Sequence, residues 1–218
     1  MTGERFNNHE SISWSEIKTR REEVKNAYPS LFAIPVMYGT KKDILCNLTK
    51  DMKGKVLDIG AAGRFMQDVC IQAGKGIDYR SMDVDTTGFH DYYSLEAVQE
   101  TFDAIFLLDV IEHVSLCEGR ALLRRCKELL NPGGSIILTL PNNNHPTAFA
   151  SDCTHVTSYR YHEVGGALLA AGFDGLRIFR ISAKGRLKHR FLAFLLTPVL
   201  KFLDMDFATG ILLVAKRN

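Results

Sequence analysis

The sequence lacks the cysteine patterns that mark disulfide-rich or zinc-binding proteins. Its five cysteines are odd in number, scattered, and never spaced as C-x-x-C. Cysteines used in this way indicate reduced thiols. The first ten residues, MTGERFNNHE, also lack the basic and then apolar layout of a signal peptide. We therefore expect a cytoplasmic protein with neither a disulfide framework nor a zinc cluster.

Long hydrophobic runs and an excess of charge of one sign are also absent. The longest uncharged apolar run, residues 191–200, is interrupted by Pro198, whereas a membrane span needs about 20 residues. The 27 basic residues nearly balance the 25 acidic ones, which argues against a nucleic-acid partner. With 46% hydrophobic and 24% charged residues among 218, the chain fits a single globular domain, residues 1–218.

Helix and strand patterns alternate along the chain, which predicts a doubly wound α/β sheet that ends in strands at one edge. A helical cap is expected over about 1–52, a core over about 53–183, and an insertion over about 184–206 before the last strand. Helices are predicted at residues 14–28, 41–51, 64–73, 115–130 and 160–171. Strands are predicted at residues 55–59, 79–84, 102–108, 135–140, 173–181 and 207–215.

A turn of small residues joins the first buried strand to the next helix. Asp58 and Ile59 lead into Gly60-Ala61-Ala62-Gly63. Small side chains let the backbone approach a ligand, and the helix start beyond them directs free N–H groups toward it. In open α/β sheets the ligand crevice lies at the carboxyl ends of the strands. The alternative for this loop alone is a tight turn without a ligand.

An acidic residue follows the next strand, about 20 residues beyond the glycine loop, where a carboxylate can accept both hydroxyls of a ribose. Asp83 is the candidate, and Asp85 is a close competitor that the sequence does not separate from it. Neither phosphate-binding fingerprint of nucleotide enzymes is present. The pattern therefore favours an adenosine ligand whose second half is neutral or zwitterionic.

Four segments, in this order, resemble the class I S-adenosylmethionine-dependent methyltransferases: residues 56–63, Asp83, residues 102–114 and residues 130–138. The resemblance covers about residues 40–181. It implies a Rossmann-like doubly wound sheet of seven strands in the order 3-2-1-4-5-7-6, with the last strand reversed. It also implies S-adenosyl-L-methionine as the cofactor and S-adenosyl-L-homocysteine as the product.

The resemblance further implies roles for individual residues in binding the cofactor. The loop from Gly60 through Ala61 and Ala62 to Gly63 approaches the methionine portion, and Asp58 would hold this loop by accepting its backbone amides. The ribose is assigned to Asp83, and the region beside the sulfonium to Leu108 and Asp109. Val84 is also assigned to cofactor binding. Because residues 86–101 are too few for a full third strand and helix, the residue that stacks on the adenine stays open, and the candidates are Tyr92, Tyr93, Ser94 and Leu95.

Two histidines lie in loops that follow carboxyl ends of strands, where a general base is useful. His155 belongs to Asp152-Cys-Thr-His-Val156, which resembles a segment that borders the acceptor pocket of small-molecule methyltransferases. The other, His113, belongs to a Glu-His-Val signature. A purely structural role is the alternative for each histidine.

The same histidines could also belong to a metal site. Asp109, Glu112 and His113, with His155 further on, resemble the E-x-x-E-H arrangement by which some family members bind a divalent ion. The first acid here is Asp rather than Glu, and most members with Glu-His-Val bind no metal. We expect no metal.

The segment 184–203 combines six basic residues, His189 included, with many apolar ones. A basic amphipathic helix of this kind can lie at a membrane interface and approach lipid-linked acceptors. Such contact would place the protein at the inner face of the membrane. The alternatives are that the segment covers the sheet or forms a homodimer contact.

Together these patterns predict an S-adenosylmethionine-dependent methyltransferase that acts on an oxygen, and less readily on a nitrogen, of a small molecule, a sugar or a lipid-linked intermediate. One alternative is a catalytically silent module that binds the cofactor, its product or a partner. Another is a nucleotide-dependent reductase, which the missing phosphate fingerprint disfavours.

Overall fold

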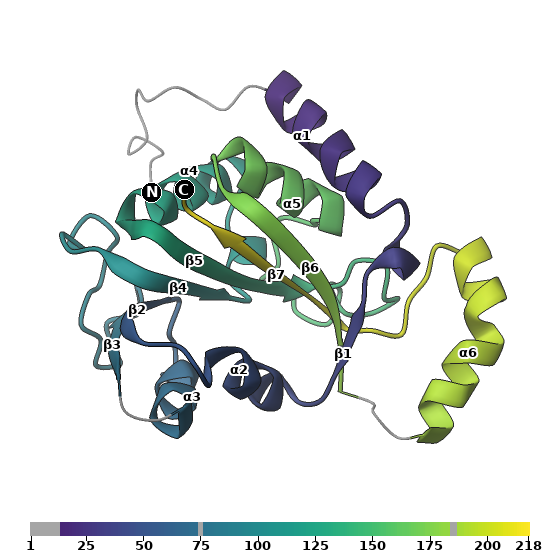
Figure 1. Ribbon diagram of the computed structural model, residues 1–218, viewed down its shortest axis with the longest axis horizontal. Coiled ribbons are helices and arrows are strands. Elements are labelled where there is room, and N and C mark those ends of the chain that lie inside the picture. The colour runs from purple at the N-terminus through teal and green to yellow at the C-terminus, as the bar shows by residue number, and fades with distance from the viewer. Residues whose placement is uncertain (1–13, 74–75, 184–186) are drawn as a thin grey trace.

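The computed structural model describes residues 14–73, 76–183 and 187–218, and shows a seven-stranded mixed sheet in the order β1-β6-β7-β5-β4-β2-β3 (Figure 1). Strand β7 is antiparallel to both of its neighbours, and the other pairs are parallel. This confirms the predicted fold class and the reversed last strand. The strands are β1 Val36–Tyr38, β2 Gly54–Ile59, β3 Ile77–Met82, β4 Phe102–Leu108, β5 Leu130–Pro141, β6 Asp174–Ser182 and β7 Gly210–Lys216.

Capping boxes define the starts of two helices. Thr40 and Asp43 exchange side-chain and backbone hydrogen bonds at one, and Ser115 and Glu118 do so at the other. The Ser-x-x-Glu spacing of residues 115–118 predicts the second box from the sequence alone, and Thr40 is likewise predicted as the cap of the helix that follows it. Ser13 and the side chain of Trp14, expected to begin and anchor the first helix, lie outside the described residues. The helices are α1 Trp14–Ala27, α2 Lys41–Thr49, α3 Phe65–Ala73, α4 Leu116–Leu129, α5 Tyr161–Ala170 and α6 Leu187–Phe202, with short 3-10 helices at Leu31–Ala33 and Ile111–His113.

The sheet separates two hydrophobic cores because successive side chains of a strand point to opposite faces. In β2, Leu57 packs in one core with Leu123 of α4, and Val56 packs in the other with Met66 of α3. Helices α1, α4 and α5 cover the first face, and α2 and α3 cover the second (Figure 1). Because β2, β3 and β4 are parallel, the loops that follow them lie together at the carboxyl ends of these strands.

Both outer edges of the sheet differ from the order that the resemblance implies. Residues 83–101 form only an isolated bridge between Met82 and Tyr92, so β3 is an edge strand. At the other edge, β1 pairs in parallel with β6 and completes the seven strands. The helical cap predicted over residues 1–52 therefore contains a strand. Three residues are too few to show a periodic pattern, and the partner of β1 lies far away in the sequence.

Three predicted strand boundaries move by a few residues. The strand predicted at 79–84 is β3, which ends at Met82, so Asp83 and Val84 follow the strand. Strand β5 begins at Leu130 because that residue already pairs with Phe102. Strand β7 begins at Gly210. None of these shifts changes the order of the elements.

None of the helices that the structure describes has both the length and the apolar character needed to cross a membrane.

Candidate functional site

The small-residue loop after β2 is tied to the end of β3. The backbone N–H groups of Gly60 and Ala61 donate to the carbonyl of Met82 at 2.8 and 3.1 Å. The N–H of Ala62 donates to Oδ2 of Asp83 at 2.7 Å. The expected acceptor of these amides was Asp58, but the structure gives them Met82 and Asp83, and the carboxylate of Asp58 is bound to Tyr79 instead.

Asp58 is bound instead to the neighbouring strand. Its Oδ2 accepts a hydrogen bond of 2.8 Å from the hydroxyl of Tyr79, which lies two residues before the paired position in β3. Burial raises the pKa of Asp58 to about 7, although the Tyr79 hydrogen bond opposes this shift. The side chain of Asp58 therefore joins β2 to β3 within the sheet.

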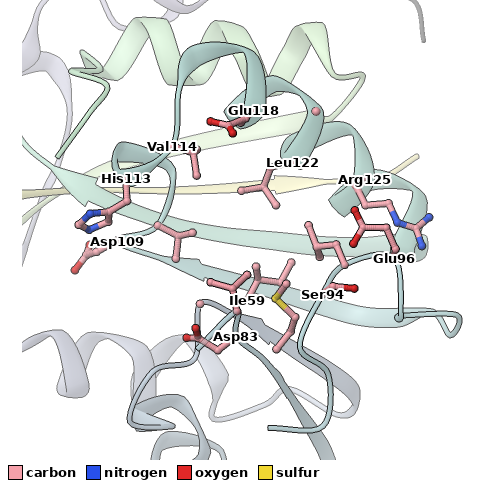
Figure 2. A pocket seen from close by; sticks show the side chains of 16 residues that line it. Ile59, Asp83, Ser94, Glu96, Asp109, His113, Val114, Glu118, Leu122 and Arg125 are labelled. Carbon is pink, nitrogen blue, oxygen red and sulfur yellow. The ribbon is translucent and has the colours of Figure 1, made fainter. Parts of the chain in front are cut away.

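A cavity of about 670 Å³ opens at the carboxyl ends of β2, β3 and β4 (Figure 2), within the size range of small-molecule sites. Six of the predicted site residues line it: Gly60, Asp83, Val84, Leu95, Asp109 and His113. Ser94, a candidate for the adenine contact, also lines it. The other predicted residues lie outside this lining: Asp58, Ala61, Ala62, Gly63, Leu108 and His155.

The cavity is elongated, and nine of its 16 lining residues were not among the predicted site residues or candidates. Asp109 and His113 lie at one end, and Glu96 and Arg125 lie at the other (Figure 2). Four of the missed residues line the wall from α4: Glu118, Ala121, Leu122 and Arg125. Their spacing of three and four residues places them on one helix face. That spacing is visible in the sequence, but by itself it does not show that this helix face lines a cavity.

The two competing acids of the ribose position differ in the structure. Asp83 lines the cavity, and its carboxylate accepts the N–H groups of Ala62 and Asp85. The carboxylate of Asp85 turns to Thr87, whose N–H and hydroxyl donate to it at 2.8 and 2.7 Å. Asp85 does not line this cavity. Of the two, only Asp83 is placed for a ligand there.

The two glycines of the loop differ in whether a side chain would fit at their positions. Gly60 has φ +72°, and a Cβ built on it would lie 2.4 Å from Cγ2 of Val110. A Cβ on Gly63 would meet nothing within 4 Å. Gly60 therefore needs to be glycine, whereas Gly63 has room for alanine. The tight contact at Gly60 is with Val110, and both residues line the cavity.

Asp109 is held in a left-handed conformation, φ +55°, directly after β4. Its N–H donates to the carbonyl of Thr139 at 3.0 Å, and the Thr139 hydroxyl donates to its Oδ1 at 2.7 Å. Its Oδ2 forms an ion pair with the ammonium of Lys41, the first residue of α2. The amino-terminal part of the chain thus reaches the cavity.

His113 and His155 lie together although they are far apart in the sequence, with ring centroids 4.9 Å apart. Nδ1 of His155 is 2.6 Å from the carbonyl of Phe149, and Nδ1 of His113 is 3.3 Å from the carbonyl of Thr154. A carbonyl only accepts, so both Nδ1 atoms carry the proton. In the neutral rings each Nε2 is then free to act as a base.

The Asp-Cys-Thr-His segment orients both rings, and Thr154 is a residue that sequence reasoning missed. Its N–H and hydroxyl donate to Oδ1 of Asp152 at 2.8 and 2.7 Å, so its oxygen is free to accept from His113 at 3.0 Å. The N–H groups of Val156 and Thr157 donate to the carbonyl of Glu112 at 2.7 and 2.9 Å. The two loops that carry the histidines are therefore fastened to each other.

Glu112 lies beside the histidine pair and is 1% exposed. Neither of its carboxylate oxygens has a hydrogen-bond partner in the part of the chain that the structure describes. Burial raises its pKa to about 8. Ligand atoms of Glu112, His113 and His155 lie within 4.8 Å of one another, which is a geometry that can hold a cation. Asp109, the fourth residue of the considered metal site, is bound to Lys41 and Thr139 instead.

Comparison with known proteins identifies the class. The family model "Methyltransferase domain" matches residues 38–178. The chain therefore belongs to the class I S-adenosylmethionine-dependent methyltransferases, which confirms the predicted family. A ubiquinone biosynthesis O-methyltransferase from Cereibacter sphaeroides (strain KD131 / KCTC 12085) is 38% identical over 36% of this chain. The match covers 28% of that relative's length.

Two solved structures show the same fold. A SAM-dependent methyltransferase from Archaeoglobus fulgidus has a TM-score of 0.61 at 16% identity, covering 81% of this chain and 94% of that one. The N-methyltransferase NodS from Bradyrhizobium japonicum, in complex with S-adenosyl-L-homocysteine, has a TM-score of 0.54 at 14% identity, covering 95% and 99%. At these low sequence identities, the similarity shows that the fold is shared.

Proposed function

We propose that the protein transfers a methyl group from S-adenosyl-L-methionine to an oxygen of a small molecule, a sugar or a lipid-linked intermediate. The observation that carries the proposal is the cavity that joins Gly60 and Asp83 at the strand ends to His113 at one end. The cofactor supplies an activated methyl group, so the chain mainly has to align acceptor and methyl and to remove a proton. Oxygen is favoured because the curated relative is named an O-methyltransferase.

We assign the residues in and next to the cavity to the two partners of the reaction. We assign the ribose hydroxyls to Asp83, and the adenine to Val84, Ser94 and Leu95, which line the same cavity. Gly60 also lines the cavity, and we assign the methionine portion to the loop that begins there. His155, in contact with the cavity residue His113, is proposed as the general base for the acceptor hydroxyl.

Replacing Asp83 with alanine is expected to weaken the binding of S-adenosyl-L-homocysteine by about 1.5 to 3 kcal/mol for each hydrogen bond lost to the carboxylate. Isothermal titration calorimetry measures this effect. The matched control is Asp85→Ala, whose carboxylate caps Thr87 and does not line the cavity. Its affinity should stay close to that of the native chain.

The native chain should bind S-adenosyl-L-homocysteine and not NADH in the same experiment. If it bound only NADH, the methyltransferase proposal would fail in favour of a reductase. Binding without turnover on any hydroxylated acceptor would instead support a silent module. An unchanged affinity in Asp83→Ala would move the ribose to another residue.

We further propose that α6 contacts an anionic membrane surface and so brings the protein to a lipid-linked acceptor. Leu195, Val199 and Phe202 recur at helical spacing and are exposed, Phe202 at 88%. The segment 184–190 contains four Lys or Arg residues and one His, and such charge favours anionic lipids. Helix α6 also stands outside the layers that cover the sheet (Figure 1). The side chains of residues 184–194 lie outside the described part.

The native chain is expected to sediment with phosphatidylserine-containing vesicles, and the double variant Val199→Ser/Phe202→Ser is expected to lose most of this binding. Ile71→Ser, which removes an exposed apolar side chain of α3, is the matched control and should behave as the native chain. Equal sedimentation of the native chain and the double variant would contradict the membrane proposal. If the double variant instead abolished a dimer in sedimentation equilibrium, α6 would be a homodimer contact.

A further inference from the structure

We propose that Arg64 is a positioning residue for the cofactor, because its guanidinium fastens the small-residue loop after β2 to the loop of residues 83–93. The two loops are then held at the spacing that a ligand spanning both of them needs. The inference rests on the proposed function and adds a residue that does not itself line the cavity. Arg64 lies between Gly63 and the first residue of α3.

The loop of residues 83–93 has little regular structure to hold it in place. Residues 83–101 contain one isolated bridge and no regular strand or helix. Beside the cavity, the N–H of Ala62 donates to the carboxylate of Asp83, but we assign the same carboxylate to the ribose. An attachment made by residues outside the cavity lining would hold the two loops together while Asp83 binds a ligand.

The guanidinium of Arg64 provides such an attachment. Its Cζ lies 5.6 Å from the ring centroid of Phe89 and 5.7 Å from that of Tyr79, both within the range of a cation–π contact. Its Nη2 lies 3.9 Å from Oδ2 of Asp91. That carboxylate accepts the N–H and the hydroxyl of Ser81 at 2.9 and 2.8 Å. The Arg64 side chain thus contacts β3 and two positions of the loop 83–93.

The ring contacts contribute more to this attachment than the ion pair does. The side chains of Arg64 and Asp91 are 25% and 28% exposed, and an ion pair at 3.9 Å between partly exposed groups contributes little. A planar guanidinium, in contrast, can lie against an aromatic face. Phe89 is 74% exposed, so its ring does not serve the hydrophobic core. Arg64 gives this exposed ring a partner.

The backbone of Arg64 also indicates that its side chain matters. Its φ of +57° is in the left-handed region, which is unfavourable for a residue with a Cβ and readily adopted by glycine. Unfavourable backbone conformations of this kind gather at functional sites. An arginine therefore occupies a position whose backbone favours glycine, and the contacts of its guanidinium offset that cost.

The variant Arg64→Gly tests the proposal sharply, because it relieves the backbone and removes only the side chain. Calorimetry compares S-adenosyl-L-homocysteine, assigned to both loops, with 5′-methylthioadenosine, which lacks the amino-acid end. We expect the affinity for S-adenosyl-L-homocysteine to fall by about fivefold or more, as for the loss of one or two cation–π contacts. The loss for 5′-methylthioadenosine should be smaller. An unchanged or higher affinity for S-adenosyl-L-homocysteine would overturn the proposal.

Variants of Phe89 test the same attachment from the other loop. Phe89→Leu keeps an apolar side chain without an aromatic face and should also weaken S-adenosyl-L-homocysteine binding, whereas Phe89→Tyr keeps the ring and should bind as the native chain does. In the background of Arg64→Gly, Phe89→Leu should cause no further loss, because the shared contact is already gone. Ile71→Ala, which truncates an exposed apolar side chain of α3, is the control and should bind as the native chain does.

The outcomes separate this inference from the function on which it rests. Additive losses in the double variant would mean that Arg64 and Phe89 act independently, and equal losses for the two ligands would mean that Arg64 does not join the loops; each result overturns the proposal. A loss of affinity that followed a lowered thermal unfolding temperature would make Arg64 a structural residue and would overturn it as well. If the native chain bound neither adenosyl ligand, the proposed function would fail first.

Discussion

Replacing His155 with alanine is expected to lower methyl-transfer turnover by about 10² to 10⁴, the range for loss of a general base. The affinity for S-adenosyl-L-homocysteine should stay nearly unchanged, because His155 does not line the cavity that contains Gly60 and Asp83. Its Nδ1 is bound to the carbonyl of Phe149, which leaves Nε2 as the basic atom. Single-turnover kinetics and calorimetry on the same preparation measure both quantities.

Other results for His155→Ala would change its role. A raised KM with little change in turnover would make it a residue that binds the acceptor. A destabilised fold with normal activity per folded molecule would make it a structural histidine. His155→Gln is the companion variant, because its amide can still donate a hydrogen bond but does not accept a proton at neutral pH.

The same turnover assay addresses the metal. We expect chelator to leave turnover unchanged, because Glu112, with its pKa raised to about 8, is protonated near neutral pH and Asp109 is bound to Lys41 and Thr139. Turnover that vanished with chelator and returned with a divalent ion would contradict this expectation. It would make Glu112, His113 and His155 ligands of that ion.

Replacing Gly60 with valine is expected to abolish binding of S-adenosyl-L-homocysteine. The first added carbon alone would lie 2.4 Å from a side-chain carbon of Val110, and the φ of +72° is unfavourable for any residue with a Cβ. A β-branched side chain would therefore push the loop and β4 apart at the cavity. We expect the variant to fold with a stability lowered by roughly 1 to 3 kcal/mol.

Gly63→Ala is the matched control in the same loop. Its Cβ would meet nothing within 4 Å, so affinity and thermal stability should both stay near those of the native chain. Calorimetry measures binding, and thermal unfolding confirms that each variant is folded. Native-like affinity in Gly60→Val would show that the ligand does not approach this loop.

The sequence by itself determined the alternation of elements and the positions of several loop residues. Local signals were sufficient: the apolar run of β4 was predicted with its observed bounds, and the Ser115 box starts α4. Gly60 and Asp83 follow strands that pair as neighbours. Because parallel strands end at a common edge, their placement follows from the fold class.

Only the tertiary structure decided which distant residues meet. Strand β1 has three residues and is defined by its pairing with β6. The histidine rings come together from two loops, and Lys41 pairs with Asp109 across 68 positions of the sequence. The cavity wall of α4 likewise depends on how that helix packs over the strand ends. Such contacts leave no pattern in the local sequence, because the residues that flank one partner do not depend on the identity of the other partner.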